Sequence, residues 1–383
     1  MKQKLLMIPG PTPVDRSILN ALSKETVSHQ DPQLVGTLAE VLKDLNTIVM
    51  TKKGQSFTVP GTGTLAMEMA LVNSLKEGDP LLVVSHGYFG DRFVEIGQTH
   101  GFQVEVLASE WGKIVEIEEI ARKLKEKRFS AITITHVDTS TGVCAPLKEI
   151  SEVVKNFPET LFIVDGVCAT GGIEERMDDW GIDILFCGNQ KAFGAPPGLA
   201  NLIFSEKALQ RRNSLGKIAA YYLDINRWLP IMREPANTYF STHAVNMVNA
   251  LHQALKIILQ EGLEERFKRH KRFALAFHQG LEALGFQILA SPEHRANTVS
   301  AVLYPAGIED TAFRKRLFEN GVVVASAKQK IAGKAFRLGH MGNISENEIM
   351  ITLSIIEKTL LEFKQDFTLG SSIKAAEEIL YKE

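Results

Sequence analysis

Short apolar runs alternate with stretches of helical periodicity between about residues 56 and 205. The strand candidates are residues 81–85, 131–135, 161–165, 182–187 and 200–204, and helical stretches lie among them at 65–75, 117–127 and 147–156. This alternation is typical of a mostly parallel sheet covered by helices. Sheets of this kind bind their ligands at the carboxyl ends of the strands. The chain is therefore predicted to be an α/β protein with a site at that edge.

The pattern changes near residue 260, where a long amphipathic helix at 245–260 ends. Beyond it we expect a basic helix at 266–284, strands at 286–289, 299–304, 322–325 and 336–338, and helices at 310–320, from Ser345 onward and at 371–383. Ser345 and Glu348 have the spacing of a capping box. The sequence thus predicts an N-terminal segment (1–14), a large domain (15–260) and a smaller α+β domain (261–383).

The composition disfavours several classes of partner. The 383 residues are 45% hydrophobic and carry a net charge of −2, so nothing indicates nucleic-acid or membrane binding. The apolar stretch near the start is too short for a signal peptide. Cys144, Cys168 and Cys187 lie far apart without metal-ligand spacing, so no metal site is expected. Free thiols without a disulfide framework favour a cytoplasmic location.

Lys191 and Asp165 carry the most chemical information. Lys191 follows the 182–187 strand in a loop rich in glycine and proline, and Asp165 ends the 161–165 strand. Such a pair suits pyridoxal phosphate chemistry, because the lysine can form a Schiff base and the carboxylate can keep the pyridine nitrogen protonated. Taken separately, each residue is more simply a surface lysine or a strand-end aspartate.

A run of small residues precedes the helix at 65–75. Thr62, Gly63 and Thr64 would leave backbone N–H groups free to bind a phosphate at that helix terminus. The same glycines fit a relaxed dinucleotide fingerprint, but residues 55–59 make a poor strand before them. A plain helix cap is the simplest alternative.

Three other residues have side chains that suit a ligand site. Phe89 lies between two glycines and can stack on a planar ring, and Thr139 belongs to a polar cluster at a strand end. Arg337 lies in a predicted strand of the small domain and can bind a carboxylate with two parallel hydrogen bonds. Each of the three also fits an ordinary structural position.

Taken together, these motifs resemble the class V aminotransferases of fold type I, in the alanine–glyoxylate, serine–glyoxylate and serine–pyruvate branch. The resemblance runs from Pro9 to about Phe363 and rests on the order and spacing of short motifs. These are Pro9-Gly-Pro11, Gly61-Thr-Gly63, Gly87-Tyr-Phe-Gly90, Thr139-Ser-Thr-Gly-Val143, Asp165-Gly-Val167, Gly171-Gly172, Gly181-Ile-Asp-Ile-Leu185, Gln190-Lys191-Ala192, Pro196-Pro197-Gly198, Tyr239 to Thr242 and Arg337-Leu-Gly339. It implies a fold type I transferase with a mostly parallel-sheet large domain, and pyridoxal 5'-phosphate as cofactor.

The resemblance also implies a role for each candidate residue. Lys191 would bind the cofactor and move the proton of the substrate Cα, Asp165 would pair with the pyridine nitrogen, and Arg337 would bind the substrate carboxylate. The remaining implied contacts are Thr62, Gly63, Thr64 and Gln190 at the phosphate, Thr139 near the ring oxygen, Phe89 and Val167 on the ring faces, and Tyr239 and Thr242 at the phosphate from the neighbouring subunit. A homodimer with shared active sites is therefore implied.

Some residues depart from the pattern of this family. Gly166 stands where relatives often have Ser, Cys168 and Thr170 replace small and apolar residues, and Phe89 replaces a frequent Trp. None of these changes removes a catalytic group. These changes bear on which amino donor and which acceptor the protein would use.

The sequence is thus interpreted as an aminotransferase that moves an amino group from alanine or serine to glyoxylate or pyruvate by a ping-pong mechanism. The alternatives are another reaction on the same scaffold, a nicotinamide-dependent oxidoreductase and a non-catalytic binding protein. Desulfuration is disfavoured because residues 322–336 contain no cysteine. The oxidoreductase would leave Lys191 and Asp165 without roles, and a binding protein would not need them.

Overall fold

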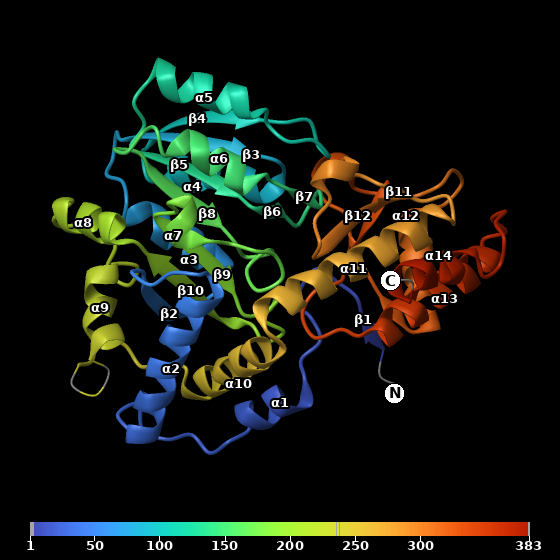
Figure 1. Cartoon of the computed structure of the whole chain (residues 1–383), viewed down its shortest axis with the longest axis horizontal. Coiled ribbons are helices and arrows are strands. Elements are labelled where there is room, and N and C mark those ends of the chain that lie inside the picture. Colours follow the sequence, from blue (N-terminus) through green and yellow to red (C-terminus); the bar gives the residue numbers. More distant parts are fainter. Residues whose placement is uncertain (1–3, 235, 237, 382–383) are drawn as a thin grey trace.

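A computed structural model of the chain describes residues 4–234, 236 and 238–381. The first three residues of the predicted N-terminal segment and the last two of the predicted tail helix lie outside this range. The described residues form two main sheets, one of seven strands and one of four, with helices around both (Figure 1).

The seven-stranded sheet has the order β2-β10-β9-β8-β5-β3-β4. Its strands are β2 (Gln55–Gly61), β3 (Pro80–Ser85), β4 (Gln103–Ala108), β5 (Ala131–Thr135), β8 (Leu161–Asp165), β9 (Ile184–Gly188) and β10 (Gly198–Phe204). The pairs β3–β4, β3–β5, β5–β8 and β8–β9 are parallel, whereas β10 runs antiparallel to β9 and β2. The predicted mostly parallel α/β sheet is confirmed.

The expectation that residues 55–59 form only a poor strand is wrong. They belong to β2, an edge strand that pairs with β10 along its whole length, from Gln55 opposite Phe204 to Gly61 opposite Gly198. The polar Ser56 is tolerated because its hydroxyl donates to Asn46 Oδ1 of the covering helix at 2.5 Å. Pattern alone misses this compensation, since it comes from a residue on another element.

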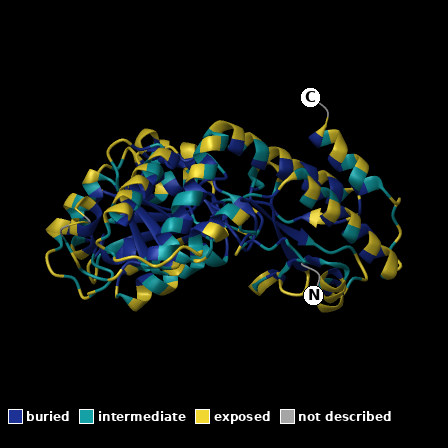
Figure 2. Cartoon of the chain, turned by 90° about the horizontal axis from the view of Figure 1, so that it is seen from below, coloured by how far each residue is buried: buried dark blue, intermediate teal, exposed yellow. Residues whose placement is uncertain are grey.

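Helices cover both faces of this sheet. Along β8, Leu161 and Ile163 face a core shared with α2 (Pro32–Ile48), α3 (Gly63–Val72), α4 (Tyr88–Thr99), α9 (Ile225–Arg233) and α10 (Val245–Glu261). Phe162 and Val164 face the opposite core, which is shared with α5 (Ile117–Glu126), α6 (Leu147–Val154) and α7 (Met177–Trp180). Strands buried on both faces explain the continuous apolar runs in the sequence. Figure 2 shows them as dark blue arrows enclosed by helices with yellow outer surfaces.

The four-stranded sheet lies in the C-terminal part of the chain and has the order β11-β12-β15-β14. Its strands are β11 (Gln287–Ile288), β12 (Val299–Leu303), β14 (Ala325–Ser326) and β15 (Ala335–Gly339). Helices α11 (Leu263–Glu282), α12 (Asp310–Asn320), α13 (Glu346–Glu362) and α14 (Ser371–Leu380) share its core. The capping box at Ser345 and Glu348 is confirmed, with both reciprocal contacts at the start of α13.

The N-terminal residues lie against this second sheet region. Strand β1 (Leu5–Leu6) pairs in parallel with β13 (Val322–Val323), and Met7 is fully buried in the same core. The start of the chain therefore packs with the C-terminal part before the chain enters α1 (Arg16–Leu22) and the elements of the large sheet. Helix α8 (Glu206–Ser214) follows β10.

The predicted domain boundary near residue 260 coincides with Gly262, which has a φ of +83° between α10 and α11. The division into domains stays a prediction.

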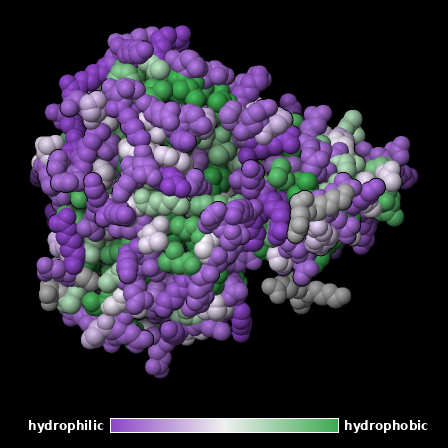
Figure 3. Space-filling view, viewed as in Figure 1, coloured by the Kyte–Doolittle hydropathy of each residue, from purple (hydrophilic) through white to green (hydrophobic). Residues whose placement is uncertain are grey.

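Figure 3 shows a mostly hydrophilic face with hydrophobic side chains in limited patches. No helix in the described residues is both long and apolar enough to span a bilayer.

Candidate active site

A cavity of about 270 Å³ opens at the carboxyl ends of the parallel strands. Nine of the predicted site residues line it: Thr62, Gly63, Thr64, Phe89, Thr139, Asp165, Val167, Gln190 and Lys191. They come from loops and helix starts that follow β2, β3, β5, β8 and β9. Residues spread over 130 positions of the sequence therefore meet at the edge where the sheet topology predicts a ligand site.

Asp165 ends β8 and is almost fully buried beside the cavity. Its Oδ1 accepts a hydrogen bond from the backbone N–H of Val167 at 2.9 Å, and Thr135 Oγ1 lies 3.5 Å from its Oδ2. Burial raises the pKa of Asp165 to about 7, although the Val167 N–H and the nearby Lys191 oppose this shift. A positive group bound in the cavity would favour the ionised carboxylate.

Lys191 lies in the turn after β9 and is 9% exposed. Burial lowers the pKa of its ammonium group. Its Nζ donates to the carbonyl of Pro9, so the N-terminal segment crosses directly over the lysine. Gly10 has a φ of +130°, and a Cβ there would lie 2.9 Å from the backbone carbonyl oxygen of Gln190. The glycine of the opening Pro-Gly-Pro motif is therefore required by this close approach.

The start of α3 has the features predicted for a phosphate site. Thr62 is the N-cap but makes no side-chain capping bond, and the first turn holds no acidic residue. Gly63 lies against Val167, and a Cβ there would come within 3.0 Å of Val167 Cγ2. The buried Oε1 of Gln190 has no hydrogen-bond partner among the described residues. Free backbone N–H groups at a helix N-terminus fit a phosphorylated ligand, and the Gln190 amide would meet it with its NH₂ group turned toward the phosphate.

The sequence reasoning missed Asp138, which organises one wall of the cavity. Its buried carboxylate accepts hydrogen bonds from the N–H groups of Phe89 (2.9 Å), Gly90 (3.1 Å) and Ser140 (2.9 Å). It thus joins the N-terminus of α4, which carries Phe89, to the loop that carries Thr139. An aspartate directly before a hydroxyl cluster was the available signal, but its partners lie about 50 residues away.

Arg337 lies on β15 and is buried at the edge of the site, although it does not line the cavity. Its Nη1 donates to the carbonyl of Thr139 at 3.2 Å, and its Nε donates to the carbonyl of Ser326 at 2.9 Å. The four-stranded sheet therefore places a guanidinium group beside the loop that carries Thr139. Five N–H groups on one arginine leave donors for a further acceptor.

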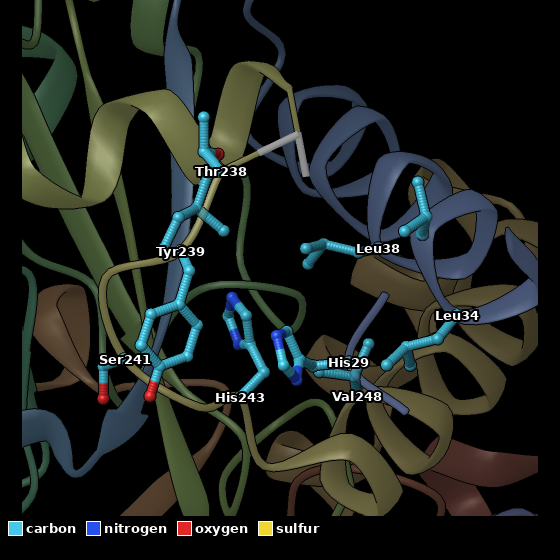
Figure 4. Close-up of a pocket in the computed structure, with 10 residues that line it drawn as sticks. His29, Leu34, Leu38, Thr238, Tyr239, Ser241, His243 and Val248 are labelled. Atoms are coloured by element: carbon cyan, nitrogen blue, oxygen red, sulfur yellow. The ribbon is translucent and has the colours of Figure 1, made fainter. Parts of the chain in front are cut away.

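Tyr239 and Thr242 do not line this cavity in a single copy of the chain. Tyr239 is 62% exposed, and its hydroxyl lies 3.2 Å from Thr242 Oγ1. With His29 and His243 it borders a second, smaller cavity beside α2, where the centre of the His29 ring lies 5.3 Å from that of the tyrosine ring and His243 lies beside His29 (Figure 4). The contribution of Tyr239 and Thr242 to the phosphate site of a neighbouring subunit stays a prediction.

Further residues line the cavity that sequence reasoning did not assign to it: Gly10, Pro11, Met67, Arg92, Val137, Cys168 and Pro197. Burial raises the pKa of the Cys168 thiol, so it is a neutral group in the wall of the site. Its Sγ lies 3.8 Å from Thr298 Oγ1. The replacement of a small residue by Cys168 therefore changes the surface that a substrate meets.

The packing around Gly166 leaves no room for the serine that the family resemblance leads us to expect there. A Cβ at this position would lie 2.2 Å from Thr170 Oγ1 and 2.9 Å from Glu175 Oε1. That space is filled by a buried cluster in which Thr170 donates to Glu175 Oε2 at 2.6 Å and His136 Nδ1 lies 2.7 Å from Glu175 Oε1. Gly166 and Thr170 are thus coupled by packing, because the Thr170 hydroxyl occupies the space that a side chain at position 166 would need.

Gly166→Ser is expected to destabilise the protein by about 1–3 kcal/mol, the usual cost of overpacking a buried site. The added atoms would displace Thr170 or separate the pair formed by His136 and Glu175. Thermal unfolding measures this, and Gly166→Ser with Thr170→Ala should recover part of the loss. Gly36→Ser, at an exposed position of α2 where a Cβ meets nothing within 4 Å, is the control. Equal stability of Gly166→Ser and the parent protein would contradict the packing argument.

Comparison with known proteins supplies the family. The family model described as aminotransferase class-V matches residues 19–341. An uncharacterised aminotransferase of Methanocaldococcus jannaschii is 39% identical, covering 100% of this chain and 98% of its own length. A soluble hydrogenase 42 kDa subunit of Anabaena cylindrica is 35% identical over 98% of both chains. A serine–glyoxylate aminotransferase of Arabidopsis thaliana is 30% identical over 98% of this chain and 94% of its own.

Solved structures agree with this result. The ureidoglycine–glyoxylate aminotransferase of Bacillus subtilis superposes with a TM-score of 0.95 at 30% identity, over 99% of this chain and 98% of that one. The alanine–glyoxylate aminotransferase of a Nostoc species has a TM-score of 0.90 at 31% identity, over 94% and 96% of the two chains. Since the family model spans most of the chain and the strand-end cavity has the expected residues, this protein belongs to the class-V aminotransferases.

Proposed function

We propose that this protein is a pyridoxal 5'-phosphate-dependent aminotransferase that uses alanine or serine as amino donor and glyoxylate or pyruvate as acceptor. The observation that carries the proposal is the meeting of Lys191, Asp165 and the free N-terminus of α3 around one cavity. Relatives and structural neighbours named for glyoxylate as acceptor support the choice of a small 2-oxo acid.

The residues present fit the cofactor. The uncapped N-terminus of α3, the Thr62 and Thr64 hydroxyls and the NH₂ group of the Gln190 amide are donors that suit the phosphate, while Phe89 and Val167 offer apolar surfaces for a ring. When bound, pyridoxal 5'-phosphate supplies an aldehyde for the amino group and a ring that withdraws electrons from the substrate.

Lys191 and Asp165 would share the proton chemistry. Because burial lowers the pKa of Lys191, a larger fraction of its amine is neutral and able to act as nucleophile and base. The Nζ would take the proton from the substrate Cα and would give it back in a later step of the reaction. The Asp165 carboxylate would hold a proton on the pyridine nitrogen, and its burial strengthens that interaction.

Arg337 would orient the substrate. Its guanidinium group is held by two backbone carbonyls, so it has a fixed direction beside Thr139. A carboxylate accepts two parallel hydrogen bonds from such a group. Binding the α-carboxylate there would direct the amino group toward Lys191.

Two measurements test this function. Protein purified with the cofactor should absorb near roughly 400 nm, and borohydride reduction should remove that band. A panel of donors that includes alanine, serine and aspartate, each with glyoxylate and pyruvate, should show the highest kcat/KM for a small donor. Absence of transamination with every pair would refute the proposal, and a clear preference for aspartate would change its substrate assignment.

We extend the proposal to a homodimer in which Tyr239 and Thr242 complete the partner's phosphate site. Both are polar, Tyr239 is exposed, and neither reaches the cavity of its own chain. A dimer gives exposed side chains of this kind a partner surface. The free thiols of Cys144, Cys168 and Cys187 fit a reducing cytoplasm, which we include as the proposed location.

Tyr239→Phe should weaken cofactor affinity by about fivefold to tenfold, the effect of losing one hydrogen bond. Cofactor should also stabilise the dimer of the parent protein more than that of the variant, because binding and association are linked. Titration of the apo protein with cofactor, followed by absorbance, measures the affinity, and sedimentation of holo and apo protein over a dilution series measures the dimer. Tyr381→Phe, which alters a tyrosine that is 60% exposed on another part of the surface, is the control. A fully active monomer would exclude the shared site.

A further inference from the structure

An arginine that sequence reasoning did not single out lies where α3 and α4 approach each other beside the cavity. Arg92 is in the second turn of α4, and its Nη1 donates to Thr64 Oγ1 at 2.8 Å. Thr64 belongs to the first turn of α3. The guanidinium group therefore reaches the helix N-terminus at which the phosphate of the cofactor is expected.

Two aromatic rings hold this guanidinium group in place. Its central carbon lies 5.0 Å from the centre of the Tyr88 ring and 4.9 Å from the centre of the Phe89 ring. Residues three and four positions apart on a helix lie on one face, so both rings come from the preceding turn of α4. Stacking on aromatic faces restricts an arginine without neutralising its charge.

No carboxylate in the described part of the chain pairs with Arg92. Its neighbour Asp91 accepts a hydrogen bond from Ser85 Oγ at 2.7 Å instead, and α3 has no acidic residue in its first turn. A second cation, Lys328, lies 5.2 Å from the centre of the Tyr88 ring. A helix N-terminus carries partial positive charge, so a guanidinium group beside it is unfavourable unless an anion binds between them.

The position of Arg92 indicates which anion would bind between its guanidinium group and the N-terminus of α3. Arg337, the expected partner of a substrate carboxylate, contacts Thr139 and Ser326. Arg92 contacts Thr64, on the α3 side of the cavity, where Thr62 and Gly63 also lie. A phosphate carries between about −1.5 and −2 charges at neutral pH and is matched well by an arginine fork.

We infer that Arg92 is a phosphate-binding residue of the cofactor site, with its guanidinium group donating to the phosphate beside Thr64. The inference rests on the proposed function, since the phosphate is that of pyridoxal 5'-phosphate. The same positive charge would suit the distal carboxylate of a dicarboxylic substrate. These two ligands give different results when the cofactor phosphate is removed chemically.

The test compares pyridoxal 5'-phosphate with pyridoxal, which has the same aldehyde and ring but no phosphate. Full-length cofactor-free protein is titrated with each compound and followed by absorbance. Arg92→Gln should weaken the affinity for pyridoxal 5'-phosphate by about 10-fold to 100-fold, the range for a hydrogen bond to a charged group. Its affinity for pyridoxal should change by less than about twofold, because pyridoxal makes no phosphate contact.

Two further variants keep the test decisive. Arg92→Lys retains the charge but loses the fork, so it should give an intermediate loss and serves if Arg92→Gln does not fold. Arg272→Gln is the control for loss of an arginine elsewhere, because Arg272 lies on α11 over the Phe273 ring at 5.9 Å and pairs with Glu346 at 2.8 Å. It should bind both compounds like the parent protein.

The remaining outcomes overturn the inference. An equal loss of both compounds would mean that Arg92 acts by supporting the Phe89 ring. Unchanged cofactor affinity with a raised KM for aspartate alone would assign Arg92 to a distal carboxylate. If the parent protein binds neither compound, the proposed function itself fails, and this result is distinct from the other two.

Discussion

Replacing Lys191 by alanine is expected to lower turnover by roughly 10⁴-fold, the upper end of what a general base contributes. The effect should be this large because one side chain is proposed both to attach the cofactor and to move the Cα proton. The variant should remain folded, since among the described residues the side chain makes a single hydrogen bond, to the Pro9 carbonyl. The absorption band at about 400 nm expected of a Schiff base between Lys191 and the cofactor aldehyde should also be lost.

A matched control separates chemistry from packing in this experiment. Lys155 also donates its Nζ to a backbone carbonyl, that of Asp179, but it lies on the surface away from the cavity. Lys155→Ala should keep the parental kcat and spectrum. A Lys191→Ala protein that still turns over and shows a band reducible by borohydride would refute the assignment of Lys191.

The fold could be predicted closely where burial leaves the sequence few choices. The expected strands at 131–135 and 161–165 coincide with β5 and β8, whose residues are buried on both faces. β2 was underestimated because its polar Ser56 is compensated by Asn46, a residue on another element. The local sequence pattern depends only on the residues of the strand itself. It does not include a residue such as Asn46, whose hydrogen bond allows Ser56 to be buried.

Candidate site residues could be predicted as closely as the buried strands where they directly follow a strand. Lys191, Asp165 and Thr62–Thr64 are placed by topology alone, because strand ends meet at one edge. Asp138 and Arg92 act through contacts with other segments; the hydroxyl cluster beside Asp138 does not reveal its partners on α4, and the sequence around Arg92 does not reveal Thr64. The same holds for Gly166, whose identity is explained only by the space that Thr170 and Glu175 occupy.

Asp165→Asn is expected to lower kcat by about 10³-fold, roughly 4 kcal/mol of transition-state stabilisation, with a smaller effect on cofactor retention. The amide is close to the carboxylate in size and can still accept from the Val167 N–H, so the fold should persist. It cannot hold a proton on the pyridine nitrogen as a carboxylate does, and the ring would then withdraw electrons poorly. Stopped-flow measurement of a single half-reaction separates this step from cofactor loss.

The pH dependence of stability gives an independent check on Asp165. Because burial raises its folded pKa from 3.8 to about 7, the protonated carboxyl contributes stability that is fully present below pH 4 and is lost as the pH rises through 7. The asparagine variant lacks this term. In cofactor-free protein its melting temperature relative to the parent should therefore rise between pH 4 and pH 8.

Bound cofactor should suppress this trend, because a protonated pyridine nitrogen beside the carboxylate favours its ionised form and lowers its pKa. Comparing the two proteins with and without pyridoxal 5'-phosphate at each pH isolates that interaction. The same trend in the presence and absence of cofactor would show that Asp165 does not contact the ring. Near-parental kcat in Asp165→Asn would mean that the residue only supports the end of β8, and both results together would remove Asp165 from the mechanism.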